Sequence, residues 1–485
     1  MTERVEQFTT RWGMLVAMLG MAVGTGNIWR FPRVVATNGG GSFLVAWVVF
    51  LLIWSVPLIL VEFAMGKATR SGNISGFARM MGKQYAWMGA WVAFVTTVIL
   101  FYYIVVAGWT IRYSLYAATG RLADADTAAV WAGFSYTWEA VIFQVIALGI
   151  GVFVVARGVR GIEAATRLLI PSLAVLVLIL AIRAVTLPGA VDGLNFMFTP
   201  SWSGPTGLSS SKVWLEALTQ NAWDTGAGWG MIMVYAIYMK KREDTALNAF
   251  ALGFANNSVS LLAGIMVLCT VFSLMPDAAM QIVGAGNEGL TFIWVPQLFA
   301  TMPGGRVFMV LFFVALFFAA VTSVISMVEL AVRNMQDLGV TRSRALVVTT
   351  AAAITFGIPS ALDQGVFGNQ DFVWGVALMV SGLFFALAVL KYGVTQFRES
   401  FINTAHSDIR IGAWWDWVIR LVVVQALVLI VWWFWQVRTE DPWGAFGWAN
   451  MATQWAVALA FFFAINGWLG RTTRVTQDLG TEAEG

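Results

Sequence analysis

Long apolar stretches follow one another along the chain, and short segments with charged or turn-forming residues separate them. A helix that crosses a lipid bilayer needs about 20 largely apolar residues, and each stretch is of roughly that length. The pattern predicts an all-α chain with about twelve membrane-spanning helices. They are expected to begin near Trp12, Phe43, Tyr85, Val141, Leu168, Val213, Ala246, Val307, Ala345, Phe372, Trp414 and Asn450.

The composition supports a membrane protein and argues against soluble domains. Of the 485 residues, 59% are hydrophobic and 11% are charged, whereas about a quarter of the residues in a soluble domain are charged. We therefore interpret residues 1–485 as one integral membrane domain with the lipid bilayer as its partner. Cys269 is the single cysteine, which excludes an intrachain disulfide, and no basic stripe indicates nucleic-acid binding.

Basic residues gather in alternate loops. Lys and Arg are frequent in the loops at residues 67–83, 240–242 and 391–410, which are expected to lie on one side of the membrane. The polar segment 1–11 belongs to that side as well. Since Lys and Arg are retained on the cytoplasmic side, both termini are predicted to be cytoplasmic, in a multi-pass protein of the inner cell membrane. The start of the chain shows no small-residue cleavage site, so we predict no signal peptide.

Two predicted spans contain glycines where a membrane helix should be continuous. The first has Gly24 and Gly26 beside Asn27, and the sixth has Asp224 before Gly226–Gly230. Glycine also serves as a packing residue in membrane helices. Interrupted helices at corresponding positions of two five-helix halves, however, indicate a binding site halfway across the bilayer. We expect repeats at about 12–186 and 213–393, two additional helices at about 411–470, and polar ends at 1–11 and 471–485.

Interrupted helices have a specific chemical use. Unwinding frees carbonyl and N–H groups that must find partners inside the membrane. Carbonyls can coordinate a cation, and the N-terminal end of a half-helix can hold a carboxylate. An amino acid zwitterion together with sodium supplies both kinds of partner.

The same residues carry a family resemblance. The run Gly24-x-Gly26-Asn27-x-x-Arg30-Phe31-Pro32 is followed by Asn38-Gly39-Gly40-Gly41-Ser42-Phe43. In these motifs the chain resembles the neurotransmitter:sodium symporter family, which has the leucine-transporter fold. That family is the standard case of five-plus-five inverted repeats with discontinuous helices 1 and 6, so the resemblance implies this architecture as well.

The resemblance implies two sodium sites and no organic cofactor. The first sodium site would use Ala22, Asn27, Asp224 and Asn256, and the second would use Gly20, Val23, Ala319, Thr322 and Ser323. Small polar residues such as Thr322 and Ser323 would otherwise be read as helix packing. The substrate would contact Ala22, Thr25, Gly26, Ile99, Tyr103, Trp223, Asp224, Gly226, Trp229, Ser323 and Met327.

These substrate contacts favour a neutral amino acid. They include no basic group, and an unpaired substrate charge among apolar and aromatic side chains would be costly. In the monoamine carriers of the family that this chain resembles, an aspartate stands at the position of Gly24 and substitutes for the carboxylate that their substrates lack. Glycine at this position therefore fits a substrate that has its own carboxylate. Alternatives are a carrier of an osmolyte or β-amino acid, or a membrane sensor that binds an amino acid without moving it. An enzyme is not indicated, because the spans contain no nucleophile–base pair.

Asp224 departs from the family pattern, in which Ser or Thr is usual. Chloride-dependent relatives hold the anion near this position with a tyrosine, which is Trp47 here. A built-in carboxylate beside the first sodium would replace the anion, so we predict that chloride is not required. The structural alternative is a neutral, protonated Asp224.

The resemblance also implies two gates. Arg30 and Asp371 match the outer pair that closes above the substrate. Asp337 matches one partner of the inner gate, but the usual arginine position holds Val5, with Arg4 one residue away. Tyr238 would assist this gate, and Glu62 would support the broken region.

Overall fold

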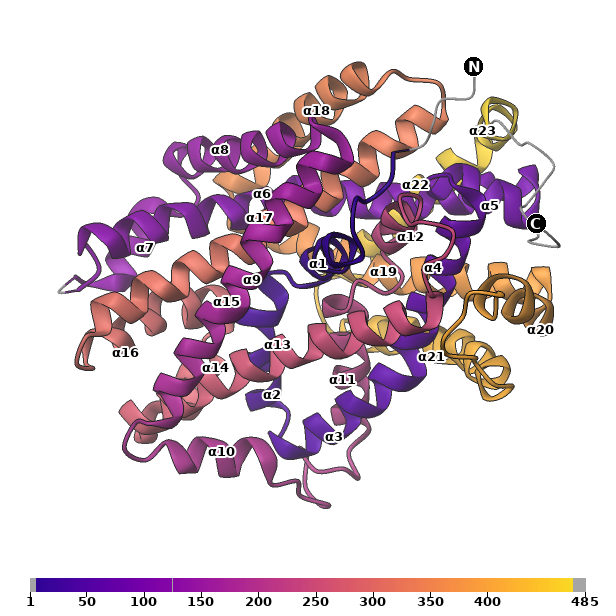
Figure 1. Cartoon of the computed structure of the whole chain (residues 1–485). Helices are drawn as coiled ribbons and strands as arrows, with labels where there is room; N and C mark the ends of the chain where they lie inside the picture. Colours follow the sequence, from indigo (N-terminus) through magenta and orange to yellow (C-terminus); the bar gives the residue numbers. More distant parts are fainter. Residues whose placement is uncertain (1–5, 124, 474–485) are drawn as a thin grey trace.

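The computed structural model describes residues 6–123 and 125–473, and it is an all-helical bundle (Figure 1). Within these residues, nine continuous helices are long and apolar enough to cross a membrane. Counting each of two bent helix pairs as one span raises the number to eleven. The sixth predicted span is divided into α11 (Ser211–Asp224) and α12 (Met231–Ala236), neither of which is long enough alone.

The first half of the chain contains five spans and two breaks in helical regularity. The first span comprises α1, a π-helical turn and α2, and the second comprises α3, a π-helical turn and α4. The bounds are α1 Arg11–Ala22, η1 Gly26–Arg30, α2 Phe31–Thr37, α3 Gly41–Phe50, η2 Leu51–Ser55, α4 Val56–Thr69, α6 Ala86–Thr119, α8 Trp138–Val155 and α9 Gly158–Val185.

The second half has the corresponding order, followed by two further spans. After α11 and α12 come α13 Thr245–Leu274, α17 Gly305–Asp337, α18 Arg342–Leu362, α19 Gln364–Tyr392, α21 Trp414–Gln436, α22 Trp448–Ala464 and α23 Asn466–Thr472. Shorter helices in the connections are α5 Asn73–Met81, α7 Thr127–Phe134, α10 Ala190–Phe198, α14 Ala279–Gly284, α15 Gly286–Glu288, η5 Gly289–Trp294, α16 Val295–Ala300 and α20 Val394–Phe397, with the turns η3 Lys83–Tyr85, η4 Pro276–Ala278 and η6 Arg398–Ile402.

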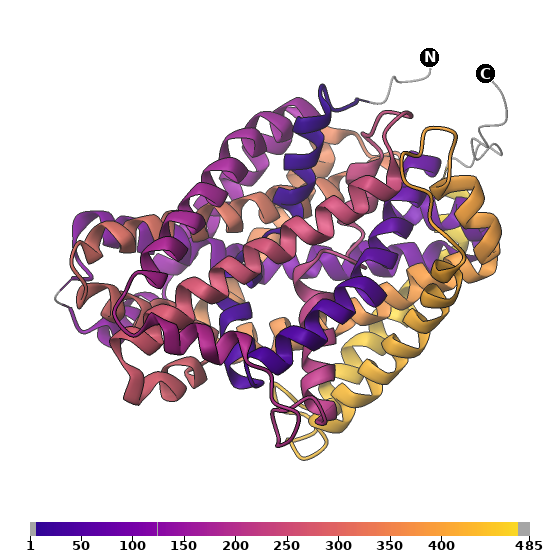
Figure 2. The ribbon, with the colours of Figure 1, turned by 60° about the horizontal axis from the view of Figure 1, so that its bottom comes forward.

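The first broken helix lies inside the bundle. Figure 1 shows α1 near the centre, and it contacts α9, α13, α17 and α12. The long helices α6 and α17 pack against each other, and α12 packs between α4 and α17. In Figure 2 the orange and yellow helices of the C-terminal part follow one edge of the bundle. Both broken helices are thus surrounded by protein, which is where exposed backbone can be tolerated in a membrane.

Two predicted span starts are wrong by more than two helical turns. Helix α9 begins at Gly158 instead of near Leu168, and α19 begins at Gln364 instead of near Phe372. In both cases charged residues ended the apolar run in the sequence. Glu163 is nevertheless buried because it is paired, and Asp371 lines an internal cavity. A paired or cavity-facing charge is compatible with a membrane helix.

Candidate functional site

The first break separates α1 from the π-helical turn that follows it. Helix α1 ends at Ala22, Val23 is extended with φ −76° and ψ 105°, and the two parts of the span are bent by 55°. The Gly24 N–H donates to Asn27 Oδ1 at 2.8 Å, so a side chain replaces the lost helical partner. The predicted interruption at Gly24–Gly26 is confirmed.

The second break is wider and depends on glycine. Gly226, Gly228 and Gly230 have φ of 72°, 88° and 78°, the left-handed region that other residues rarely adopt. Glu62 from α4 accepts from the Gly228 N–H at 2.6 Å and from the Met233 N–H at 3.2 Å. Its side chain is fully buried, so one carboxylate satisfies donors that the unwound chain leaves inside the membrane.

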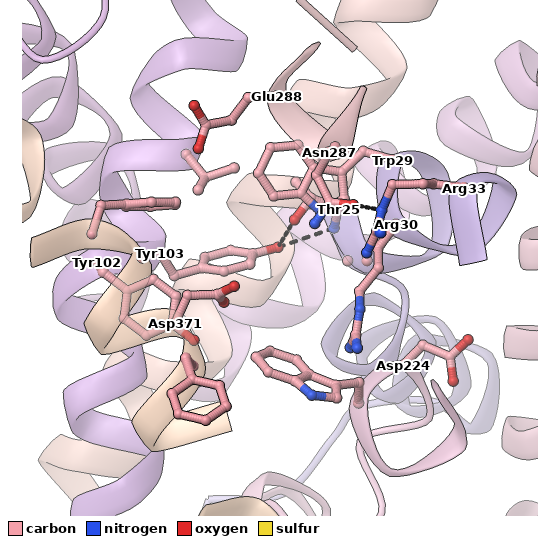
Figure 3. Close-up of a pocket in the computed structure, with 18 of the residues that line it drawn as sticks. Thr25, Trp29, Arg30, Arg33, Tyr102, Tyr103, Asp224, Asn287, Glu288 and Asp371 are labelled. Carbon is pink, nitrogen blue, oxygen red and sulfur yellow. Dashed lines mark hydrogen bonds between the residues drawn. The ribbon is translucent and has the colours of Figure 1, made fainter. Parts of the chain in front are cut away.

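The two breaks meet at one cavity. A Cβ added at Gly226 would lie 3.8 Å from Ala22 Cα, which places the two interrupted backbones in contact. The cavity beside them has a volume of about 820 Å³ and continues past Arg30 and Asp371 to Glu288 and Phe446. Figure 3 shows Tyr103 directed at Thr25 across this space, where its hydroxyl oxygen accepts from the Thr25 N–H and hydroxyl at 3.1 Å each.

The structure brings all but one of the predicted substrate residues to this cavity. The residues that line it are Ala22, Thr25, Gly26, Tyr103, Trp223, Asp224, Gly226, Trp229, Ser323 and Met327. Ile99 is fully buried and does not line the cavity. The family resemblance implied this contact, and Ile99 lies one turn before Tyr103 on α6; the contact with substrate stays a prediction.

Three of the four residues predicted for the first sodium site, Asn27, Asp224 and Asn256, belong to one hydrogen-bonded group that Ser260 joins. Asn27 Nδ2 donates to Asn256 Oδ1 at 3.0 Å and to Ser260 Oγ at 2.7 Å. Asp224 Oδ2 accepts from Gln220 Nε2 at 3.2 Å and from Ser260 Oγ at 3.4 Å. Asp224 Oδ1 is buried and has no hydrogen-bond partner among the described residues. A buried carboxylate oxygen with adjacent amide oxygens is a suitable ligand set for a hard cation.

The residues predicted for the second sodium site lie on helices that contact each other, α1 and α17. Thr322 Oγ1 donates to Ala319 O at 3.0 Å, and Ser323 Oγ donates to the same carbonyl at 3.3 Å. Gly20 allows α1 to approach α9, since a Cβ there would lie 3.0 Å from the Ile170 side chain. Val23 is the extended residue at the end of α1. The coordination itself stays a prediction.

The outer-gate residues face the same cavity but are not joined. Figure 3 shows Arg30 and Asp371 on different sides of it, and no ion pair within 4.0 Å connects them in the part of the chain that the structure describes. The Arg30 guanidinium lies 4.8 Å from the Trp223 ring centre, a cation–π contact. The cavity is continuous from the breaks past these two side chains to a vestibule beside Glu288 and Phe446.

The residues predicted for the inner gate lie away from this cavity, in two groups of polar contacts. Asp337 accepts from the Gly72 N–H and pairs with Arg333 at 3.2 Å. Tyr238 donates to Glu329 Oε1 at 2.5 Å, and Arg342 pairs with Glu329 at 2.6 Å. Arg4 and Val5, which the resemblance made relevant to this gate, lie outside the described residues.

Several residues of the vestibule were not predicted from the sequence. Arg33 Nε donates to Asn287 Oδ1 at 2.6 Å, which ties α2 to α15, and Tyr136 donates to Glu288 Oε1 at 3.0 Å. Burial raises the pKa of Glu288, although the hydrogen bond from Tyr136 opposes that rise. The sequence around Glu288 does not indicate that this residue is buried, because it is a charged residue in a short connection. Only the folded structure places α15 beside the cavity.

Gly24 is predicted to be intolerant of any side chain. A Cβ there would lie 2.8 Å from Ser323 Oγ and 3.0 Å from Tyr103 Oη, so Gly24→Ala must displace groups that surround the break. We expect a loss of uptake of at least about tenfold, the effect of about 1.4 kcal/mol at the site. Uptake in proteoliposomes measures it. Gly149→Ala, where an added Cβ meets nothing within 4 Å, is the control, and wild-type uptake by Gly24→Ala would contradict the prediction.

Comparison with known proteins decides the family. The model of the sodium:neurotransmitter symporter family matches residues 5–135 and 133–473. The chain belongs to this family. It is therefore a sodium-dependent membrane transporter and not an enzyme, which confirms the resemblance seen in the sequence motifs.

Among relatives of this symporter, an uncharacterized sodium-dependent transporter of Methanocaldococcus jannaschii is 29% identical, over 88% of this chain and 90% of that protein. The sodium-dependent serotonin transporter of Drosophila melanogaster is 27% identical, over 82% and 72%. A crystal structure of MhsT in complex with L-phenylalanine is similar with a TM-score of 0.78 and 29% identity, over 88% of this chain and 99% of that chain. The symporter thus has the leucine-transporter fold.

Proposed function

We propose that the protein is a symporter that imports a neutral, hydrophobic amino acid together with sodium by alternating access. One observation carries the proposal: two broken helices meet beside a cavity where backbone groups and the Thr25 and Tyr103 hydroxyls lie close to aromatic and apolar side chains. Backbone groups of this kind suit the two charged ends of an amino acid.

The polar end of the substrate would lie at the breaks. The N–H groups near Thr25 and Gly26 and the Tyr103 hydroxyl suit the carboxylate, and carbonyls of Ala22, Trp223 and Asp224 suit the ammonium. Trp229 O already accepts from Thr96 Oγ1 at 2.6 Å. The Asp224 carboxyl group is directed away from Tyr103 in Figure 3 and faces Gln220 and Ser260.

The side chain of the substrate would contact Trp223, Trp229 and Met327. The two indole rings are T-shaped with centres 6.0 Å apart, and their hydrophobic surface favours an apolar or aromatic group. The similar protein MhsT has been crystallised with L-phenylalanine, which supports this substrate class. An osmolyte or β-amino acid is the alternative cargo.

Two sodium ions would drive the import. Each charge that moves inward gains about 2.3 kcal/mol per 100 mV, so two ions supply roughly 4–5 kcal/mol, or about three decades of accumulation. The substrate carboxylate would complete the shell of the first sodium, which makes the binding of each dependent on the other. Asp224 would supply the negative charge that chloride supplies in some relatives.

The proposed orientation has both termini in the cytoplasm, so that the cavity beside Arg30 and Asp371 faces outward. The basic loops support it. We also propose that residues of about 12–186 and 213–393 form the two repeats, because each begins with a broken helix.

The proposal predicts sodium-dependent binding. Purified protein should bind leucine, phenylalanine or tryptophan in sodium, and replacing all sodium by potassium should weaken binding at least about fivefold, as expected from a coupling free energy of about 1–3 kcal/mol. Competition of radiolabelled substrate in both salts, with alanine and taurine included, measures this. Equal binding in sodium and potassium would refute the coupling of substrate to sodium. A preference for taurine would favour the osmolyte carrier. Binding without uptake in proteoliposomes would favour a sensor.

A further inference from the structure

The described start of the chain is attached to α9 through two carboxylates, Glu6, which accepts from the Val159 N–H at 2.8 Å, and Glu163. The Thr9 N–H donates to Glu163 Oε2 at 2.8 Å, and its hydroxyl donates to Oε1 at 2.6 Å. The Thr10 N–H and hydroxyl both reach Oε1 at 3.3 Å. Glu163 therefore lies at the N-terminal end of α1, where a negative charge is favoured by the helix dipole.

The Glu163 carboxylate is closely packed, although Thr9 and Thr10, which donate to it, are exposed. The Glu163 side chain is 3% exposed, and a Cβ at Gly13 would lie 1.9 Å from Glu163 Oε1, so glycine is required for the carboxylate to fit. Thr10 is also the N-cap of α1, because its hydroxyl oxygen accepts from the Gly13 N–H at 3.0 Å. Charge-assisted hydrogen bonds in such surroundings are among the stronger ones in proteins.

The contact can nevertheless be broken without isolating the charge. Arg167 lies one turn further along α9, 2.5 Å from Glu163 Oε1, and is 40% exposed. If α1 moved away, this arginine would remain beside Glu163 on the same helix. A buried carboxylate that keeps its counter-ion avoids most of the cost of an unpaired charge.

The attached segment lies at the opposite end of α1 from the outer cavity. Helix α1 has 12 residues, so its start is about 18 Å from the break, in the direction away from α2. Beside it, Phe8 packs its ring against Tyr235 and Tyr238, and its N–H donates to Tyr238 O at 3.1 Å. The segment thus covers α12 on the side where an inward-facing carrier must open.

We propose that Glu163 is a positioning residue of the cytoplasmic gate. It holds the start of α1 against α9 while the cavity is open on the outer side, and it releases Thr9 and Thr10 when the carrier opens inward. The inference rests on the proposed alternating access and orientation but not on the identity of the substrate. A wrong substrate class would leave it intact.

The test measures how accessible the inner pathway is. Ser326 is 1% exposed, its Oγ lies 2.9 Å from Tyr235 Oη, and Tyr235 is covered by Phe8, so Ser326→Cys reports on this layer. Cys269→Ala provides a background without other thiols. In inverted vesicles with sodium, Glu163→Gln should raise the rate at which a membrane-impermeant thiol reagent modifies position 326 by at least about fivefold. The matched control is Glu139→Gln, which removes a glutamate paired with Arg112.

The outcomes separate a gate from a structural tether. A rate for Glu163→Gln equal to that of Glu139→Gln overturns the proposal, even if thermal stability falls. Thr9→Val, which removes one donor and leaves Glu163 with Arg167, should raise the rate about twofold. If Glu163→Gln does not fold, Thr9→Val provides the test. An unchanged modification rate at position 326 in Thr9→Val would also overturn the proposal. The thiol assay needs no substrate, so failure of the sodium-dependent binding experiment would be a distinct result.

Discussion

Asp224→Asn is expected to lower sodium-dependent uptake by at least about a hundredfold, because removing one partner of a buried ion pair costs about 3–5 kcal/mol and each 1.4 kcal/mol is tenfold. The amide keeps the shape of the side chain and removes the charge that would face the first sodium. The Oδ1 atom, which lacks a partner among the described residues in the wild type, would then be a neutral ligand.

Uptake of radiolabelled substrate at several sodium concentrations measures this effect. Asp192→Asn on α10 is the matched control, since Asp192 is exposed and lies outside the cavity. Wild-type sodium affinity in Asp224→Asn would show that a neutral carboxylic acid with a structural hydrogen bond is the correct interpretation of this residue.

The same charge makes chloride unnecessary in the proposed mechanism. Wild-type uptake should be unchanged when gluconate replaces chloride, because the carboxylate beside Gln220 and Ser260 balances the sodium. Trp47 stands at the position of the family's tyrosine, and its Nε1 has no hydrogen-bond partner within the described part of the chain. A large loss of wild-type uptake without chloride would rule out the proposed role of Asp224.

Glu62→Ala is expected to have the second largest effect. It leaves the N–H groups of Gly228 and Met233 unsatisfied inside the protein, and each such donor costs about 1–3 kcal/mol. The loss of about 2–6 kcal/mol should abolish uptake and lower the melting temperature by several degrees. Because the second break would then have no acceptor, substrate protection against unfolding should disappear as well.

Thermal unfolding of purified protein with and without sodium and substrate measures this. Glu62→Gln retains one carbonyl acceptor and should lie between the wild type and Glu62→Ala. Glu139→Ala, which removes an ion-paired glutamate at a half-exposed position, controls for the loss of a carboxylate. A wild-type melting temperature for Glu62→Ala would mean that the break does not depend on this side chain.

The local sequence pattern predicted the features that the lipid environment imposes, namely the membrane spans and the breaks within them. Apolar stretches fixed most of the spans because lipid demands about 20 apolar residues whatever lies next to them. Gly24 and the glycines of Gly226–Gly230 predicted both breaks, because glycine is unfavourable inside a helix and these glycines occur at corresponding positions of the two halves. The identity of Asn27 and Asp224 beside these breaks was also sufficient to suggest a sodium site, although the ligands of that site stay a prediction.

Only the tertiary structure decided how distant residues are paired. Glu62 reaches a backbone donor 166 positions away, and Glu163 reaches one 154 positions away. The surroundings that folding supplies also explain the wrong starts of α9 and α19, since Glu163 is paired and Asp371 lines a cavity. Hydropathy scores a charge by its own polarity, whereas the cost of burying it depends on a partner that folding brings from elsewhere in the chain.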